Sequence, residues 1–217
     1  MKAPVAGVLL AAGESTRMGE PKPLLAWAGT TLVSWQCRQL RDAGCDLVAV
    51  VVGHEAGRVR AAIQAAGDGY VFTVENLSYR EGRASSLRSA ASFLAALSAE
   101  RPPGQAIQSV AILNVDQPRP AWATKAMIEA AEKTAALIVQ PAFGGHRSHP
   151  VLLDASLLPE LAAVEEATLG LRAVMTRHAR ETEVVTLTPG PAPFDLDLNT
   201  PTDYKAALAS FDRGDWG

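Results

Sequence analysis

Apolar residues along the chain fall into short unbroken runs that alternate with segments of helical spacing. Val5–Leu10 and Leu47–Val52 are apolar runs of strand length, and the second, rich in β-branched residues, is typical of a strand covered on both faces. Residues 31–43, between them, repeat apolar side chains at the spacing of one helical face. Further strands are expected at Tyr70–Val74 and Val110–Val115, with helices around Val59 and Ile63 and around Leu87, Ala91 and Leu94. This βαβαβα order implies a parallel sheet.

The alternation becomes less regular after residue 115. The segments expected there are a helix from Pro120 to about Lys133, strands at Leu137–Val139, Val151–Leu153 and Glu183–Leu187, helices at Pro159–Val164 and Thr168–His178, and an alternating segment at Phe194–Leu198. Thr200, Pro201 and Asp203 have the identities of an N-cap, a first-turn proline and an N3 acid, so a last helix is expected after them. The linker-like stretch Arg101–Gly104 is too short to separate domains.

The composition narrows the class of protein. Of 217 residues, 48% are hydrophobic and 20% charged, which is typical of a globular protein, and we expect a single domain over residues 1–217. Twenty Lys and Arg against 23 Asp and Glu leave no broad basic surface, so we expect neither a nucleic-acid nor a membrane partner. No signal-peptide pattern opens the chain, and the expected location is cytoplasmic. Cys37 and Cys45 lack further ligands at metal-binding spacing and are interpreted as reduced apolar residues.

The loop after the first expected strand combines glycines with two cations. Small residues there allow backbone N–H groups to approach phosphate oxygens, and Arg17 and Lys22 add positive charge. The loop leaves the carboxyl end of a strand, where open α/β sheets bind ligands. The spacing from Gly13 to Gly19 is one residue too long for a P-loop, and no G-x-G-x-x-G occurs. The loop is therefore either a phosphate site of another kind or a surface loop with solvated Arg and Lys side chains.

Four segments, in order, give the chain a specific resemblance. They are Leu10-Ala11-Ala12-Gly13-x-Ser15-x-Arg17-x-Gly19-x-x-Lys22, then Asn76 with Gly82-x-x-Ser85-Ser86-Leu87, then Asp116-Gln117-Pro118, and finally Asp197-Leu198-Asn199-Thr200-Pro201-x-Asp203. Together they resemble the nucleotidyltransferases of molybdenum cofactor biosynthesis, most closely the cytidylyltransferase type. The resemblance implies an α/β fold, a Rossmann-like three-layer sandwich with a mostly parallel sheet, of the nucleotide-diphospho-sugar transferase type. It also implies transfer of a nucleoside monophosphate from an NTP to a phosphorylated acceptor, with Mg²⁺ and release of pyrophosphate.

The resemblance implies roles for two groups of residues. The nucleotide-binding positions it implies are Leu10, Ala11, Ala12, Gly13, Lys22, Gly82, Ser85 and Ser86. Arg17 and Lys22 are expected to screen the triphosphate and to stabilise the leaving pyrophosphate, so both are candidate catalytic residues. Gly82 and the two serines open a helix, where free N–H groups and hydroxyls can contact a base edge. An ordinary N-cap serine is compatible with that interpretation.

Two aspartates are the candidate metal ligands. Asp116 ends an apolar run, so it should emerge at the same sheet edge as the phosphate loop, where a carboxylate can hold a cation between phosphates. The alternative for Asp116, also a candidate catalytic residue, is a turn or cap before the helix after Pro120. Strand alternation places Asp195 and Asp197 on one face, and the resemblance selects Asp197 as the second Mg²⁺ ligand. Asp203 is more simply the N3 acid of the last helix.

The choice of substrates rests on two positions of the first loop. Guanylyltransferases of the family tend to read Leu-Ala-Gly-Gly, and sugar-phosphate enzymes commonly have glycine at position 15, so Ala12 and Ser15 favour CTP, with molybdopterin as acceptor. GTP with molybdopterin, or another NTP with a sugar or alcohol phosphate, stays open. A third hypothesis is a noncatalytic nucleotide-binding or chaperone-like module that delivers a cofactor to a partner enzyme, although Lys22, Asp116 and Asp197 argue against it. The partners expected from the resemblance also include transient contact with a molybdoenzyme or its chaperone.

The acceptor region is where the chain departs from the family. The family usually reads Gly-His-Pro where this chain has Ser148-His149-Pro150. His146 and His149 are three residues apart, but the surrounding Gly, Ser and Pro residues favour a loop with no further ligand nearby. Metal binding, a structural or solvent-facing role, and contact with the acceptor all stay open for the two histidines.

Overall fold

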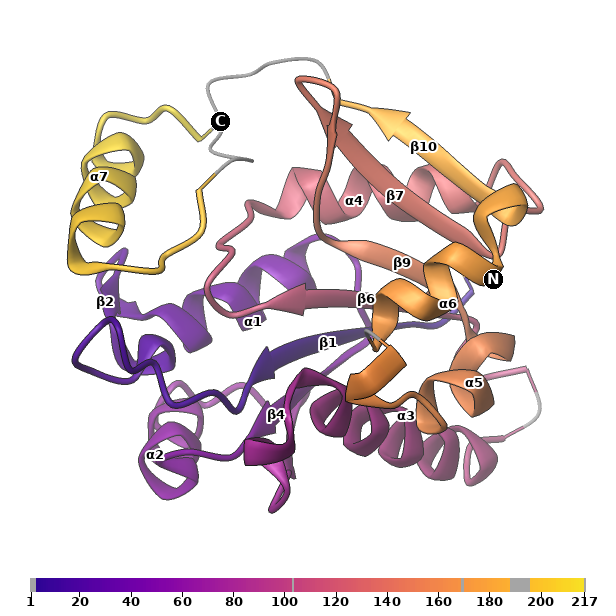
Figure 1. Ribbon diagram of the computed structural model, residues 1–217, viewed down its shortest axis with the longest axis horizontal. Coiled ribbons are helices and arrows are strands. Elements are labelled where there is room, and N and C mark those ends of the chain that lie inside the picture. The colour runs from indigo at the N-terminus through magenta and orange to yellow at the C-terminus, as the bar shows by residue number, and fades with distance from the viewer. Residues whose placement is uncertain (1–2, 103, 169, 188–195, 217) are drawn as a thin grey trace.

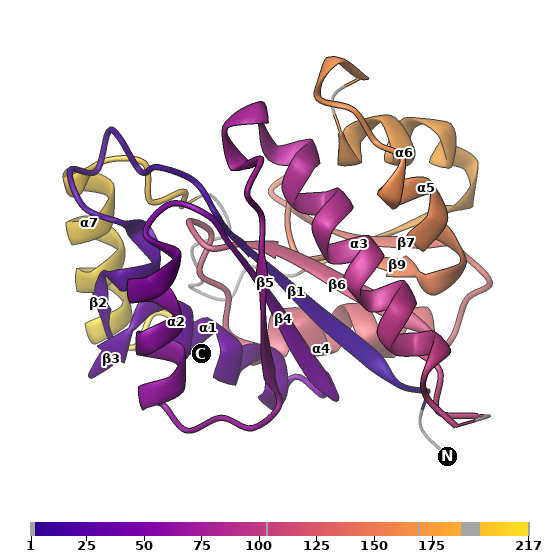
Figure 2. The same cartoon turned by 90° about the horizontal axis from the view of Figure 1, so that it is seen from below.

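A central sheet lies between two layers of helices in the computed structural model of the chain (Figures 1 and 2). The structure describes residues 3–102, 104–168, 170–187 and 196–216. The sheet has the order β10-β7-β9-β6-β1-β4-β5, with β8 beside β7. Its strands are β1 (Val5–Ala11), β4 (Leu47–Val52), β5 (Val71–Glu75), β6 (Ser109–Asn114), β7 (Ile138–Phe143), β8 (His146–Arg147), β9 (Val151–Asp154) and β10 (Thr182–Thr186). The predicted three-layer α/β fold is confirmed.

Helices cover both faces of the sheet, and a short hairpin lies beside it. The helices are α1 (Leu32–Asp42), α2 (Ala56–Ala65), α3 (Arg83–Ala99), α4 (Ala121–Ala131), α5 (Leu158–Ala162), α6 (Leu171–Arg177) and α7 (Pro201–Asp212). The hairpin is formed by β2 (Ala26–Trp27) and β3 (Thr30–Thr31), and single helical turns occur at η1 (Lys22–Leu24), η2 (Tyr79–Glu81), η3 (Ala155–Leu157), η4 (Glu166–Thr168) and η5 (Ala179–Glu181). The hairpin is an element that the hydrophobic pattern did not predict.

Most neighbouring strands are parallel, as the βα alternation predicted. Strand β1 pairs in parallel with β4 and β6, β4 with β5, and β7 with β10. Strand β9 is antiparallel to both β6 and β7, and β8 is antiparallel to β7. The chain reverses after β7 at Gly144 and Gly145, whose φ angles of 55° and 85° suit glycine. The irregular region expected after residue 115 is therefore an antiparallel insertion into an otherwise parallel sheet.

Strand β4 shows how the apolar pattern builds two cores. Its residues alternate between the two faces of the sheet, because successive side chains of a strand point in opposite directions. Val48, Val50 and Val52 pack in the core beneath α1, α2 and α4, whereas Leu47, Ala49 and Val51 pack beneath α3, α5 and α6. All six residues are buried. The expectation of a strand covered on both faces is confirmed.

Aromatic side chains hold the last helix against the hairpin and α1. Trp27 is buried, and its ring centroid lies 5.2 Å from that of Trp216 and 5.5 Å from that of Phe211. Trp35 packs edge-on against Phe211 at 5.7 Å. Helix α7 begins with the predicted capping box, in which Thr200 accepts from the Asp203 N–H and the Asp203 carboxylate accepts from the Thr200 N–H. This packing fixes the chain just before α7, which reaches the functional site.

Two expected elements differ from the structure. Residues 196–198 form no strand, so the prediction over Phe194–Leu198 is wrong for them, and residues 194–195 lie outside the described part. The Leu198 N–H donates to the Asp116 carbonyl at 2.8 Å, a single hydrogen bond rather than a ladder. The helix predicted over Thr168–His178 begins only at Leu171, because Gly170 has a φ of 55°. In the described part of the chain, no helix is long and apolar enough to cross a membrane.

Candidate active site

A pocket of about 210 Å³ opens at the carboxyl ends of β1 and β6. Strand β1 lies between β4 and β6, so the order of strands along the sheet reverses direction at β1. Open α/β sheets bind ligands at such a switch point, beyond the carboxyl ends of the strands. The lining residues are Leu10, Ala12, Gly13, Ser15, Thr16, Arg17, Lys22, Arg83, Ser86, Asn114, Val115, Asp116 and Asn199. We call this the strand-end pocket. It brings the predicted loop and Asp116 to one place.

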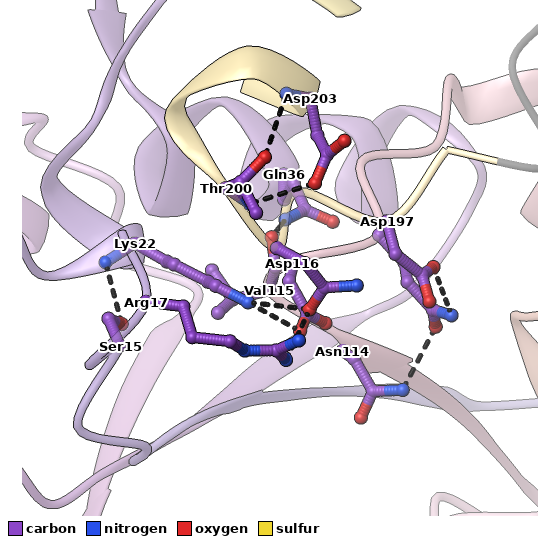
Figure 3. A network of polar contacts seen from close by, with 12 residues as sticks. Ser15, Arg17, Lys22, Gln36, Asn114, Val115, Asp116, Asp197, Thr200 and Asp203 are labelled. Atoms are coloured by element: carbon purple, nitrogen blue, oxygen red, sulfur yellow. Dashed lines mark hydrogen bonds and ion pairs between the residues drawn. The ribbon is translucent and has the colours of Figure 1, made fainter. Parts of the chain in front are cut away.

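Lys22 is the centre of the polar network in this pocket (Figure 3). Its ammonium group donates to Asp116 Oδ2 at 3.0 Å and to Asn199 Oδ1 at 3.3 Å. The side chains of Lys22 and Asp116 are only 11% and 17% exposed, so solvent screens their attraction weakly. Arg17 Nη2 donates to the same Asn199 oxygen at 3.0 Å. Residues from the first loop, the end of β6 and the start of α7 thus share one network.

Ser15 shapes the loop that carries these cations. Its φ of 55° turns the backbone sharply, its carbonyl accepts from the Met18 N–H at 2.9 Å, and its hydroxyl accepts from the Lys22 N–H at 3.0 Å. A Cβ placed on Gly13 would meet no heavy atom within 4 Å, so the loop leaves open space beside its backbone. A loop with free backbone beside two cations can accommodate phosphate oxygens. Ala11, by contrast, packs in the core beneath α1 and does not line the pocket.

Asp197 lies beside the strand-end pocket rather than in its lining. Its Oδ1 accepts from Gln117 Nε2 at 2.8 Å, and Gln117 Oε1 accepts from Asn114 Nδ2 at 2.9 Å (Figure 3). The hydrogen bond from the Leu198 N–H to the Asp116 carbonyl holds the two aspartate-bearing segments together. Within the described residues, no group of three or more His, Cys, Asp and Glu side chains could hold a metal ion. The carboxylate and amide oxygens here suit a hard cation that completes its shell with phosphates and water, as Mg²⁺ does.

The start of α3 forms another wall of the pocket. Asn76 is buried and donates to Ser85 Oγ at 2.8 Å and to Ser86 Oγ at 3.0 Å. The Ser85 hydroxyl donates a hydrogen bond to the Gly82 carbonyl, so Ser85 has an internal role, whereas Ser86 lines the pocket. Gly82 does not line the pocket, and its φ of 110° brings it against the side chain of Glu166. Of the three predicted positions, only Ser86 faces the open space.

A second and larger pocket, of about 720 Å³, adjoins the first on the α3 and α6 side of the sheet. The two pockets share Leu10, Arg83 and Asn114. The remaining lining residues are Ala84, Leu87, Ile112, Gln140, Arg147, His149, Glu166, Gly170, Leu171, Arg172, Met175, Thr176 and Ala179. We call this the side pocket. Arg147 and His149, from the region where the sequence analysis expected acceptor contacts, therefore line a cavity that adjoins the strand-end pocket.

The Ser148-His149 segment is fixed to the rest of the site by a buried arginine. Arg119 is 1% exposed, and its guanidinium donates to the His149 carbonyl at 3.3 Å and to Ser148 Oγ at 3.2 Å. The serine that replaces the expected glycine thus contributes a hydrogen bond. Burial, reinforced by Arg119, lowers the pKa of His149 to about 4, so its imidazole is neutral at pH 7. His149 lines the side pocket, whereas His146 is exposed on β8.

Several polar residues that line these pockets were not selected from the sequence as site residues. They include Arg83, Asn114, Asn199 and Gln140. Asn114 and Asn199 each neighbour a predicted aspartate within two residues, which was the available signal. Gln140 carried no signal, because its position depends on the antiparallel insertion of β9.

A mostly parallel sheet with a glycine-containing loop, a buried lysine and an aspartate at its strand switch is typical of nucleotide-binding α/β proteins. Residues 7–182 match the family model of the MobA-like NTP transferase domain. The chain belongs to this family and carries its nucleotidyltransferase domain. The resemblance found in the sequence is confirmed at this level.

Solved structures share the fold of this chain. Rv0371c from Mycobacterium tuberculosis H37Rv is 27% identical, with a TM-score of 0.72 over 97% of this chain and 100% of that chain. A structure of the same protein in complex with manganese is 25% identical, with a TM-score of 0.68 over 97% of this chain and 100% of that chain.

Three curated relatives are similar over different lengths. Nicotine blue oxidoreductase of Paenarthrobacter nicotinovorans is 31% identical over 176 residues, 77% of this chain and 79% of that protein. Bifunctional protein GlmU of Pelobacter propionicus is 46% identical over 66 residues, 30% of this chain and only 14% of that protein. The "Probable molybdenum cofactor guanylyltransferase" of Bacillus cytotoxicus is 40% identical over 58 residues, 27% of this chain and 28% of that protein.

Proposed function

We propose that the chain is one catalytic domain that transfers CMP from CTP to the phosphate of molybdopterin and releases pyrophosphate, with Mg²⁺ as cofactor. The observation that carries the proposal is that two pockets adjoin and share three lining residues, one pocket lined by cations at a strand switch and the other larger and mostly apolar. The first suits a nucleoside triphosphate and the second suits an organic acceptor. Leu10, Arg83 and Asn114, which line both, mark where the two substrates would meet.

The reaction requires charge stabilisation rather than a catalytic base. An oxygen of the acceptor phosphate bonds to the α-phosphorus of CTP while the bond to the α,β-bridging oxygen breaks, and its electron pair leaves with pyrophosphate. The attacking oxygen is already anionic at neutral pH, so no side chain must remove a proton. Lys22 and Arg17 would stabilise the negative charge that develops on pyrophosphate. Arg83, at the boundary of the pockets, would orient the acceptor phosphate.

Asp116 and Asp197 would hold the cation. When bound, Mg²⁺ would neutralise phosphate charge and hold the triphosphate in one geometry. Asp116 Oδ2 faces the Lys22 ammonium at 3.0 Å in the free protein. Asp116 would then exchange part of this ion pair for the cation, leaving Lys22 to bind the phosphates. The manganese complex of Rv0371C supports a divalent cation in this fold.

The choice of CTP rests on Ala12 and Ser15. Ala12 lines the strand-end pocket where guanylyltransferases of the family tend to have glycine, and the hydroxyl of Ser15 is used to fix the loop through the Lys22 N–H. GTP is the alternative within the same reaction, and the likeness to a protein named as a guanylyltransferase keeps it in the test.

A second candidate function is an oxidoreductase. It is favoured by the alignment with nicotine blue oxidoreductase, which spans most of both proteins. In that case the strand-end pocket would hold a nucleotide cofactor and the side pocket a ring to be reduced. Lys22 and Asp116, placed for phosphate and cation chemistry, favour the transferase.

One screen separates these candidates. Pyrophosphate release is measured with each of the four NTPs and Mg²⁺, in the presence and absence of molybdopterin and of a set of sugar phosphates. The proposal predicts release that requires CTP, Mg²⁺ and molybdopterin together. A preference for GTP of tenfold or more would replace the nucleotide but keep the reaction. Oxidation of NADPH with a heterocyclic acceptor, without pyrophosphate release, would establish the oxidoreductase instead.

A further inference from the structure

Helix α1 reaches the end of β6 through a buried amide. Gln36 is fully buried, and its Nε2 donates to the Val115 carbonyl at 2.6 Å (Figure 3). The ladder between β1 and β6 ends at Asn114, and just beyond it the Val115 N–H still donates to the Leu10 carbonyl at 3.0 Å. The Val115 carbonyl lies past the end of this ladder, where a buried carbonyl needs another donor. Gln36 supplies that donor from a different layer of the fold.

The hydrogen bond from Gln36 lies on one side of the Asp116 α-carbon, and a second hydrogen bond lies on the other side. The Val115 carbonyl belongs to the peptide group that precedes this α-carbon. The Asp116 carbonyl belongs to the peptide group that follows it, and it accepts from the Leu198 N–H at 2.8 Å. Because peptide groups are planar, Asp116 can turn only by moving one of these two bonded groups. Hydrogen bonds on both sides therefore fix the backbone that carries the carboxylate.

A second glutamine of α1 holds the other end of the same segment. Gln39, three residues after Gln36, accepts from the Ala121 N–H at 2.9 Å through its Oε1. Ala121 begins α4, whose N-cap residue provides no side-chain hydrogen bond. Neither glutamine lines the strand-end pocket or the side pocket, so neither is placed to touch a substrate there. The two glutamines hold residues 115–121 to α1 at both ends.

The contact between Gln36 and Val115 has a cost for folding. Gln36 Oε1 is buried and has no hydrogen-bond partner within the described part of the chain. The core on this face of the sheet also takes Val33, Cys37 and Leu40 from α1, so an apolar side chain would suit position 36. A buried acceptor without a partner destabilises the fold. Departures of this kind from favourable packing are expected near functional sites.

We propose that Gln36 is a positioning residue, which through the Val115 carbonyl holds Asp116 in the direction that binds the divalent cation. The inference rests on the proposed function, in which Asp116 is a ligand of that cation. Asp116 Oδ2 lies 3.0 Å from the Lys22 ammonium group in the strand-end pocket, where the cation would bind. Groups behind a metal ligand orient it, and their loss typically lowers metal affinity about 10- to 100-fold. Gln36 acts in this way on the backbone of the ligand.

Titration with Mn²⁺ alone tests the effect on the cation. Free Mn²⁺ is measured by electron paramagnetic resonance in the presence of the full chain without nucleotide, and the binding that Asp116→Asn abolishes defines the site. Gln36→Met removes the donor at similar side-chain size and should raise the dissociation constant of that site about tenfold or more. Gln39→Met is the matched control on the same helix. It should leave the dissociation constant unchanged, because its hydrogen bond is at Ala121.

Amide exchange followed by NMR tests the same contact without metal or nucleotide. In Gln36→Met the N–H groups of Val115 and Gln117 should exchange about fivefold faster or more, as expected when a hydrogen bond beside them is lost, while the amides of β4 keep their wild-type rates. The melting temperature should change by only a few degrees, because the substitution removes one unpartnered acceptor, Gln36 Oε1, and leaves another, the Val115 carbonyl. Gln36→Leu takes the place of Gln36→Met if that variant does not fold.

Four results would overturn the inference. They are a wild type without a Mn²⁺ site at Asp116, an unchanged dissociation constant in folded Gln36→Met, an equal loss of affinity in Gln39→Met, and amide exchange that is either unchanged at Val115 and Gln117 or faster throughout the chain. The last result would mean that Gln36 does not act on this segment or only stabilises the fold.

The proposed function is judged separately by pyrophosphate release. Mn²⁺ binding that depends on Gln36, with no pyrophosphate release from any of the four NTPs, would support the positioning role and reject the transfer reaction. Pyrophosphate release with wild-type metal dependence in Gln36→Met would do the reverse.

Discussion

Replacing Gly82 by alanine tests how the start of α3 is held. Gly82 precedes the helix with φ of 110° and ψ of −177°, a conformation that side chains rarely adopt. An added Cβ would lie 2.3 Å from Cδ and 2.5 Å from Oε2 of Glu166. That same Oε2 accepts from the Ala84 N–H at 2.8 Å. Alanine at position 82 must therefore strain the backbone and displace the carboxylate from the helix start.

The expected cost follows from these two effects. The backbone conformation costs a residue other than glycine about 1–3 kcal/mol. Loss of the hydrogen bond from the Ala84 N–H to Glu166 adds about 1 kcal/mol to the cost. This is below the usual value for a hydrogen bond to a charged group, because the exposed carboxylate can be rehydrated. Gly82→Ala should thus lower the free energy of unfolding by about 2–4 kcal/mol. It should also raise the KM for the nucleotide, because α3 carries Ser86 into the strand-end pocket.

Urea unfolding followed by circular dichroism measures the effect, with two controls. Gly104→Ala has a similarly positive φ of 82° and no atom within 4 Å of the added Cβ, so it reports backbone strain alone. In a Glu166→Ala background the obstructing carboxylate is gone, and the cost of Gly82→Ala should fall by about 1 kcal/mol. An equal cost of Gly82→Ala in both backgrounds would refute the role assigned to Glu166.

Further predictions concern charge and pH. Lys22→Ala should lower kcat for pyrophosphate release about 10²-fold at saturating nucleotide, because the lost charge stabilises the leaving pyrophosphate. An unchanged kcat would mean that Lys22 contributes to nucleotide binding only. Asp116→Asn should leave the melting temperature within a few degrees of wild type while abolishing metal-dependent turnover, and full activity at ordinary Mg²⁺ concentrations would exclude Asp116 as a ligand. Burial lowers the pKa of His149 from 6.5 to about 4 in the folded protein. Between pH 6.5 and pH 4 the imidazole is therefore protonated in the unfolded chain but not in the folded protein. Urea titrations should therefore show a His149-dependent loss of stability, at most about 3 kcal/mol, as pH falls from 6.5 to 4, and an identical pH profile in His149→Phe would contradict it.

The fold was predictable where local pattern and burial agree. The uniform apolar run at Leu47–Val52 predicted a doubly covered strand, and the residues Thr200, Pro201 and Asp203 predicted the capping box of α7. The meeting of the first loop with Asp116 was also predictable, because parallel strands end at the same sheet edge. In each case the information lies within a few residues or in a general rule of sheet topology.

The rest depends on contacts between distant segments. The direction of β9 is not encoded in its three apolar residues, and it is β9 that completes the sheet between β6 and β7. Gln140, on β7, lines the side pocket, and Arg83, the first residue of α3, lines both pockets. Asp197 was expected on a strand, but the chain there is held by a single backbone bond to Asp116 and by Gln117. Such placements cannot be inferred from spacing along the sequence.

The central claim is that a nucleoside monophosphate moves to an acceptor phosphate. It is tested most directly by following CTP labelled at the α-phosphorus, in parallel with CTP labelled at the γ-phosphorus, during incubation with the protein, Mg²⁺ and molybdopterin. The account predicts that the α-label appears in a product containing both CMP and the pterin, while the γ-label appears in pyrophosphate. Transfer of the γ-label to the acceptor, or retention of both labels in unreacted CTP while wild-type protein stays folded, would contradict it.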